Sequence, residues 1–161
     1  MKLSDSLSGL ASIIIPSCNP LESTRQCIAA LMRYTRRPWE LIVVDDGSSD
    51  ETSAYLESLR DAAPVPVTVI TNVTSRGIAA AINQGLKAAR GEYLVVRNND
   101  VVVTSGWLWQ RIALAIAKGD FTAEHAEHAE TKTEREKRDL RSIWVRGRED
   151  RVSGWREGGE D

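Results

Sequence analysis

Hydrophobic and polar positions divide the chain into two kinds of segment that alternate. Short apolar runs rich in β-branched residues are typical of parallel strands that are buried on both faces. Between these runs, apolar residues recur at the spacing of amphipathic helices. We predict strands over residues 11–16, 39–44, 67–71 and 93–96, and helices over residues 22–34, 48–60, 78–89 and 104–118.

Residues at the ends of the predicted helices support these boundaries. Ser48 or Ser49 is expected to cap the second helix, and Thr104 the fourth. Gly91 is expected to close the third helix as a C′ glycine. The order βαβαβαβα predicts an α/β fold, in which helices cover both faces of a parallel sheet and right-handed crossovers join the strands.

Polar side chains follow the predicted strands. In open α/β sheets, ligands bind beyond the carboxyl ends of the strands, so these side chains are expected to meet at one edge. They are Pro16 to Asn19, Asp45, Asp46, Asn72, and Asn98 to Asp100.

The chemistry of these groups suits a divalent cation and a ribose. Asp100 has the oxygen ligands that a hard divalent cation prefers, while Asn98 and Asn99 can bond ribose hydroxyls or water. The alternative for this triplet is a polar turn that caps the next helix. Capping is also an alternative for Asp45 or Asp46, but two adjacent carboxylates repel each other and are harder to explain by capping alone.

Composition narrows the function classes. A net charge of −2 implies neither nucleic acid nor an anionic membrane as a partner. Two cysteines make no disulfide framework, and the chain has neither a membrane-span-length apolar segment nor a signal peptide, so we expect a cytoplasmic protein. Dinucleotide, P-loop and nucleophile-elbow motifs are missing from the sequence.

The composition changes near Gly119. Half of the residues in 120–161 are charged, and this segment has almost no apolar stripe of the kind that packs a helix against a core. We therefore predict two parts: a domain over residues 1–119, and a charged C-terminal tail over residues 120–161 that is helical or disordered and does not join the core. The break also suggests the hypothesis of a truncated gene or an altered reading frame.

Four segments resemble family 2 glycosyltransferases with the Rossmann-like GT-A fold, in the family's order and spacing. One of them reads Leu-Ile-Val-Val-Asp-Asp-Gly-Ser-Ser-Asp, and the last holds the family's DXD-type motif as Asn-Asn-Asp. The segments are residues 13–19, 41–50, 72 with 76–85, and 89–94 with 98–100.

This resemblance implies an inverting sugar transfer from a nucleotide-diphosphate sugar to an unknown acceptor. It implies that Asp100 ligates a divalent metal, Mg²⁺ or Mn²⁺, which bridges the diphosphate. The implied nucleotide-sugar site consists of Pro16, Ser17, Cys18, Asn19, Asp45, Asp46, Arg76, Gly77, Asn83, Asn98 and Asn99.

The chain departs from the family pattern at three points. Cys18 stands where an aromatic residue is common in the family. Arg97 stands where an apolar residue is usual, and the cost of its charge depends on whether it points into the core or toward the diphosphate. After Lys118 nothing matches the family's acceptor half or its catalytic base. The alternative is therefore a non-catalytic nucleotide-sugar-binding fragment. A sugar nucleotidyltransferase would need a glycine-rich basic loop after the first strand, which this chain lacks.

Overall fold

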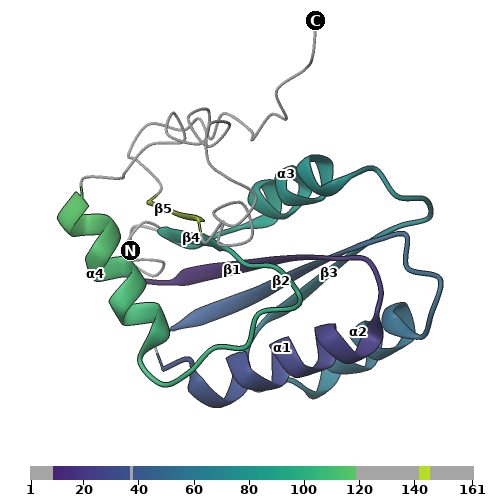
Figure 1. Cartoon of the computed structure of the whole chain (residues 1–161), viewed down its shortest axis with the longest axis horizontal. Coiled ribbons are helices and arrows are strands. Elements are labelled where there is room, and N and C mark those ends of the chain that lie inside the picture. The colour runs from purple at the N-terminus through teal and green to yellow at the C-terminus, as the bar shows by residue number, and fades with distance from the viewer. Residues whose placement is uncertain (1–8, 37, 119–141, 146–161) are drawn as a thin grey trace, which may run out of the picture.

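The computed structural model describes residues 9–36, 38–118 and 142–145. Strands and helices alternate along the chain as predicted, and a short fifth strand follows (Figure 1). The elements are β1 (Ala11–Ser17), α1 (Leu21–Tyr34), β2 (Trp39–Asp46), α2 (Thr52–Ala62), β3 (Val67–Asn72), α3 (Ile78–Ala88), β4 (Tyr93–Val96), α4 (Trp107–Lys118) and β5 (Ser142–Val145).

The five strands form one sheet in the order β3-β2-β1-β4-β5. β1 lies at its centre and pairs in parallel with both β2 and β4, and β2 pairs in parallel with β3. The predicted parallel sheet is therefore confirmed, with each of the four apolar runs in a strand. Every residue of β1 is buried, because neighbouring strands cover its edges and helices cover both of its faces.

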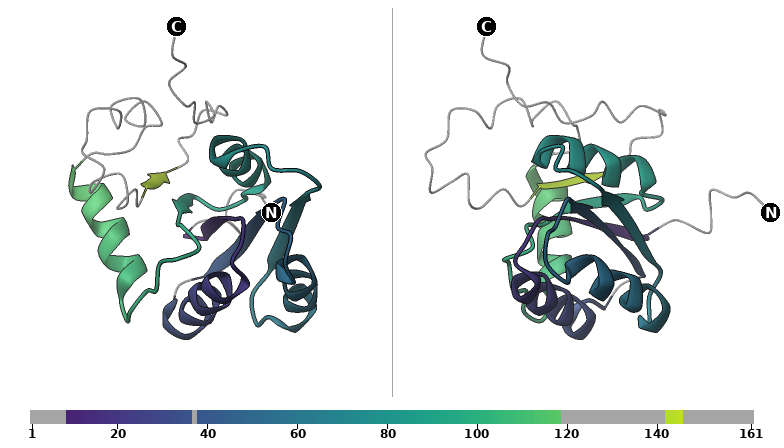
Figure 2. Two further views of the ribbon diagram at one scale, coloured as in Figure 1. Left: turned by 45° about the vertical axis from the view of Figure 1, so that its right-hand side comes forward. Right: turned by 90° about the vertical axis from the view of Figure 1, so that its right-hand side faces the viewer.

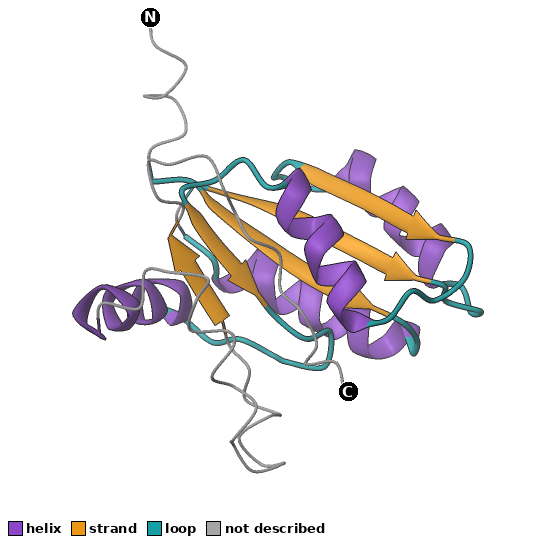
Figure 3. Cartoon of the chain, turned by 90° about the horizontal axis from the view of Figure 1, so that it is seen from above, coloured by secondary structure: helices purple, strands orange, loops and turns teal. Residues whose placement is uncertain are grey.

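Successive residues of the strands face opposite layers of helices, as the pleat of a strand requires. Ile13 and Ile15 pack into a core shared with α1, α2 and α4, whereas Ile14 packs into a second core against α3. Figure 3 shows the sheet between the two helical layers, and Figure 2 shows the same arrangement from other directions.

Gly91 has a different role from the predicted one. α3 ends at Ala88, and Gly91 does not have the positive φ of a C′ glycine. A Cβ at Gly91 would lie 2.7 Å from the carbonyl oxygen of Leu10, so only glycine lets this backbone pass β1. Its N–H donates to Ser12 Oγ at 2.8 Å, and Ser12 in turn donates to the buried carboxylate of Glu40 at 2.6 Å.

Two predicted helix caps are wrong. α2 begins at Thr52, and Ser48 and Ser49 lie before it in a loop, where both contact Asn19. A helix capped by Thr104 would begin at residue 105, but α4 begins at Trp107. In both cases polar residues of the loop bind other groups or face solvent, so the helix starts later than its local pattern predicts.

The C-terminal tail was predicted to stay outside the core, and four of its residues do not. Ser142–Val145 forms β5 and pairs antiparallel with β4, with Val95 opposite Ile143. The predictions for the rest of residues 120–161 lie outside the described residues, and the boundary at Gly119 stays a prediction. Within the described ranges, none of the helices has the length and hydrophobicity needed to cross a bilayer.

Candidate nucleotide-sugar site

A cleft of about 320 Å³ opens at the carboxyl edge of the sheet. The ends of β1 and β2, the start of α3 and the turn after β4 form its walls. The predicted convergence of polar groups at this edge is thus present in the structure. The lining residues are Pro16, Ser17, Cys18, Asp46, Ser75, Gly77, Ile78, Ala81, Asn98, Asn99 and Asp100.

Asp46 holds the loop between β3 and α3 against the end of β2. Its Oδ1 accepts hydrogen bonds from Asn72 Nδ2 and the Arg76 amide, each at 2.8 Å. Its Oδ2 accepts from Ser75 Oγ at 2.8 Å and from the Gly77 amide at 3.0 Å. A carboxylate has about four acceptor positions, so these four donors fill all of the acceptor positions of Asp46.

The protonation of Asp46 follows from this environment. Burial alone would raise the pKa of its carboxyl group, but the bonds from Arg76, Asn72, Ser75 and Gly77 outweigh burial and lower the pKa below its ordinary value. The charged form is therefore the one that holds the loop at neutral pH. Asp46 lines the cleft with only 5% of its surface exposed.

Asp45 is oriented away from the cleft and does not line it. Its side chain is fully buried on the α2 side of the sheet. Oδ1 accepts a hydrogen bond from the Ser48 amide at 3.1 Å, and Oδ2 accepts from the hydroxyl of Ser53. Asp45 therefore shapes the turn between β2 and α2.

Asn19 joins two loops beside the cleft without lining it. Its Nδ2 donates to Ser49 Oγ at 3.1 Å, and its Oδ1 accepts from the Ser49 amide at 3.2 Å. Its backbone has a φ of 35°, a conformation that asparagine adopts more readily than most residues. These bonds fasten the turn after β1 to the turn after β2.

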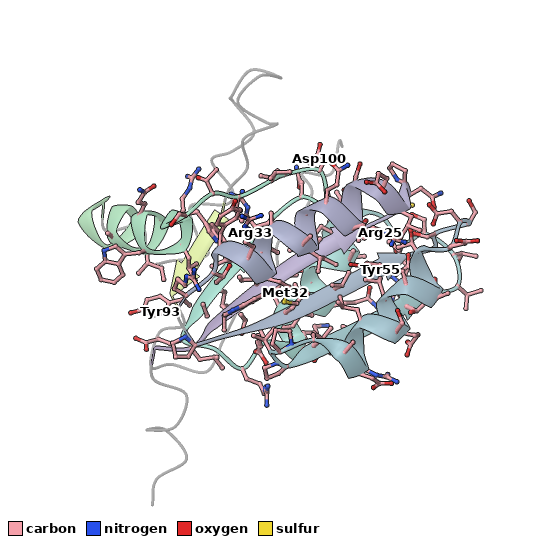
Figure 4. The ribbon with its side chains drawn as sticks, turned by 90° about the horizontal axis from the view of Figure 1, so that it is seen from below. Arg25, Met32, Arg33, Tyr55, Tyr93 and Asp100 are labelled. Carbon is pink, nitrogen blue, oxygen red and sulfur yellow. The ribbon has the colours of Figure 1, made fainter. Side chains whose placement is uncertain are left out.

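The turn Asn98–Asp100 forms the wall opposite Asp46. Asn98 and Asn99 are half-buried, and Asp100 is exposed on the connection between β4 and α4 (Figure 4). No described residue donates a hydrogen bond to the Asp100 carboxylate. The turn thus presents a carboxylate without a hydrogen-bond donor among the described residues at the rim of the cleft.

The donor set fits a metal that is shared with a phosphate ligand. Among the described residues, no group of three or more His, Cys, Asp or Glu is placed to hold a metal by itself. Mg²⁺ commonly uses one or two carboxylates together with substrate phosphates and water. Asp100 with the neighbouring amides of Asn98 and Asn99 matches that pattern.

The other residues singled out from the sequence do not line the cleft. Arg76 contributes its backbone to Asp46 and its side chain is exposed, while Asn83 is half-buried on α3. Arg97 points into the core: it is 5% exposed, and its guanidinium lies 5.0 Å from the centre of the Trp107 ring, a cation–π distance.

Four residues at the site were not predicted. Ser75, Ile78 and Ala81 line the cleft from the loop before α3 and from its first turn. They could have been predicted from Gly77, because neighbouring residues of the loop and of the first turn of α3 lie on the same surface as Gly77. Thr24 lies beneath the cleft on α1, and nothing in the local sequence marks it.

Curated proteins with similar sequences include several bacterial glycosyltransferases. The chain is 31% identical to the Escherichia coli UDP-Glc:alpha-D-GlcNAc-diphosphoundecaprenol beta-1,3-glucosyltransferase WfgD over 108 residues, which are 67% of this chain and 40% of that protein. It is 36% identical over 105 residues to the uncharacterized glycosyltransferase EpsJ of Bacillus subtilis, covering 64% of this chain and 29% of EpsJ. The chain therefore spans two-fifths or less of these relatives.

Two solved structures resemble this chain in fold. Staphylococcus aureus TarS 1–349, determined in complex with UDP, is 25% identical with a TM-score of 0.57, over 66% of this chain and 32% of that one. The mannosyltransferase PcManGT from Pyrobaculum calidifontis, in complex with GDP-Man and Mn²⁺, is 24% identical with a TM-score of 0.56 over 61% of this chain and 29% of that one, a likeness of fold.

The family comparison extends further along the chain than the motifs do. The model of glycosyl transferase family 2 matches residues 12–158, which takes in the central sheet, the cleft and much of the C-terminal tail. The chain belongs to glycosyl transferase family 2.

Proposed function

We propose that the cleft binds a nucleotide-diphosphate sugar together with Mg²⁺ or Mn²⁺, and that the chain supplies the donor side of an inverting sugar transfer. The observation that carries this proposal is the exposed Asp100 carboxylate, to which no described residue donates a hydrogen bond, at the rim of a cleft whose other walls offer serine hydroxyl and asparagine amide groups beside the Asp46 carboxylate. The TarS structures determined with UDP and with UDP-GlcNAc support a nucleotide sugar as the ligand class.

In this proposal Pro16, Ser17 and Cys18 contact the nucleoside, and Asn98 and Asn99 bond the ribose. Asp46 acts on the nucleoside through the loop that it holds, which places Gly77 at the cleft. Asp45, Asn19, Arg76 and Asn83 shape the surrounding loops and α3. The small Cys18 side chain offers less stacking surface to a base than an aromatic residue would.

The transfer exchanges one bond of the sugar for another. The acceptor hydroxyl oxygen forms a bond to the anomeric carbon from the face opposite the diphosphate. The bond from that carbon to the diphosphate breaks, its electron pair leaves with the diphosphate, and the hydroxyl proton passes to a base. A divalent metal supplies positive charge next to the leaving diphosphate. Asp100 is the residue that would hold it.

A second candidate is a nucleotide-sugar-binding chain without transferase activity. It is favoured by the roles of the two carboxylates that line the cleft: Asp46 accepts four hydrogen bonds from the loop before α3, and Asp100 is the proposed metal ligand, so neither is available as the acceptor base. The chain also spans two-fifths or less of its curated relatives. Little sugar transfer by the 161-residue chain, with donor binding intact, is expected in this case.

Replacing Asp100 with Asn tests the metal assignment. The amide keeps the shape and removes the charge, so UDP or GDP binding measured by calorimetry should lose most of its Mn²⁺ dependence while the fold stays intact. Asp46→Asn should instead weaken binding with and without Mn²⁺, because it loosens the loop.

Asp61→Asn is the matched control, because Asp61 is an exposed aspartate on α2 away from the cleft. A screen of nucleotide sugars with and without Mn²⁺ should come first, to identify the base and sugar. Unchanged Mn²⁺-dependent affinity in Asp100→Asn would eliminate the metal assignment.

A further inference from the structure

Thr24 connects two walls of the cleft from beneath. It lies on α1 and is fully buried. Its Oγ1 accepts a hydrogen bond from Asn99 Nδ2 at 3.1 Å and is 2.8 Å from Ser17 Oγ, a second hydrogen bond. Ser17 ends β1 and Asn99 follows β4, so one hydroxyl group bridges segments 82 positions apart in the chain.

The hydrogen-bonding capacity of a hydroxyl group suits this bridge. A threonine hydroxyl has one proton to donate and two acceptor positions. Asn99 uses one acceptor position, so the proton remains free to be donated to Ser17. A buried side chain of the same shape without the hydroxyl would leave Asn99 Nδ2 and Ser17 Oγ without this partner.

A second contact from the same face of α1 reaches the same turn. Cys27 lies one helical turn after Thr24, and its Sγ donates to the carbonyl oxygen of Asn98 at 3.7 Å. The turn has little support of its own, since its internal backbone bond, from the Val101 amide to the Asn98 carbonyl oxygen, is 3.4 Å long. Contacts from α1 therefore hold Asn98 and Asn99 in place.

We propose that Thr24 is a positioning residue of the donor site. By holding Asn99 against Ser17, it sets the place of Asp100, the next residue, relative to the β1 wall of the cleft. Thr24 itself contacts neither donor nor metal. The proposal rests on the proposed function only for its effect on ligand affinity, because its geometric effect on the turn exists without any ligand.

The test uses the full chain with two substitutions at one position. Thr24→Val keeps the shape and removes the hydroxyl, so UDP or GDP affinity in the presence of Mn²⁺ should fall about five- to ten-fold. Thr24→Ser restores the hydroxyl and should stay within about two-fold of the wild-type affinity. Thr24→Ala also lacks the hydroxyl but leaves room for a water, and it serves if valine prevents folding.

Thr35→Val is the matched control. Thr35 is also a buried threonine of the α1 region, and its Oγ1 accepts from Trp107 Nε1 at 3.1 Å, at the end of α1 opposite to the cleft. It should lower the melting temperature without changing nucleotide affinity. An affinity loss as large in Thr35→Val as in Thr24→Val would show that general destabilisation is the cause and overturn the proposal.

Hydrogen exchange of the ligand-free chain gives a readout independent of binding. Backbone amides of residues 98–101 should exchange faster in Thr24→Val than in wild type or Thr35→Val. Unchanged exchange there, or wild-type affinity in Thr24→Val, overturns the proposal. If the wild-type chain binds neither nucleotide, the proposed function fails and the exchange measurement alone decides the role of Thr24.

Discussion

Asp45 and Asp46 are adjacent, yet their carboxylates belong to different layers of the molecule. Successive side chains of a strand point to opposite faces. Asp45 therefore meets Ser53 on the α2 side, and Asp46 meets the loop before α3. The strand geometry also resolves the repulsion expected of neighbouring carboxylates, because each has its own set of donors on its own face.

Replacing Asp46 with Asn should destabilise the fold in a pH-dependent way. Because the folded state lowers the pKa of Asp46, its contribution to the free energy of unfolding is complete above the ordinary pKa and is lost as the pH falls below about 4. We expect a loss of about 2–3 kcal/mol at pH 7 in urea unfolding and a smaller difference from wild type at pH 3. A loss equal at both pH values would contradict this role.

The two cysteines should differ sharply in reactivity. Cys18 is exposed at the cleft, whereas Cys27 is buried, and burial raises the pKa of its thiol to about 11. Iodoacetamide at neutral pH should modify one cysteine in the native chain and two in denaturant, since the thiolate is the reactive form. UDP with Mn²⁺ should slow the native reaction if the proposed site is right. Cys18→Ser should abolish that reaction, and rapid native labelling in this variant would contradict the burial of Cys27.

At the scale of elements, α3 packs against β1 at a point where only glycine fits. A Cβ at Gly85 would lie 2.3 Å from Cγ2 of Ile14 in the middle of the sheet. This close approach brings the first turn of α3 to the cleft, where Ile78 and Ala81 line one wall. The glycine thus couples helix packing to the geometry of the site.

Gly85→Ala should lower stability even though alanine favours helices. The gain in helix propensity is about 1 kcal/mol, and the overpacking cost in a close-packed core is about 1–3 kcal/mol, so a net loss of up to about 2 kcal/mol is expected in urea unfolding. The double variant Gly85→Ala with Ile14→Ala removes the clash, and its loss should be smaller than the sum of the single losses. Additive losses would mean that the two side chains do not compete for space.

For the whole molecule, β5 completes the sheet beside the strand that leads into the cleft. β4 has four residues and is covered by β1 on one edge and by β5 on the other. Without β5, the outer edge of β4 would present unpaired backbone groups, which promote association between chains. The C-terminal segment is therefore expected to matter for the stability of the domain.

A chain ending at Lys118 should unfold at lower urea concentration than the full chain and should associate as its concentration rises. A chain ending at Gly147 keeps β5 and is the matched control, expected to behave as the full chain does. Urea unfolding and size-exclusion chromatography measure the two effects. Equal stability and size for both truncated chains would show that β5 contributes little.

The sequence by itself determined the strands β1 to β4, the four helices, their order along the chain and the edge where polar groups gather. The run Ile13 to Ile15 predicts a strand because β-branched side chains suit the pleat, and helical periodicity predicts the helices between the strands. These are local properties of neighbouring residues. A parallel sheet then places Asn98 to Asp100 at the same edge as Ser17 without any knowledge of side-chain contacts, whereas the strand order that makes them neighbours comes from the structure.

Only the tertiary structure decided which polar residues face the cleft and which hold it. Arg97 lies over Trp107 in the core, Asp46 is committed to a loop 26 to 31 positions away, and Thr24 joins Asn99 across 75 positions. β5 likewise adds to β4 from within a charged stretch: Ile143 to Val145 are strand-forming types, but only the fold shows which strand they join. Contacts over such separations depend on how whole elements pack, and local residue patterns carry no information about them.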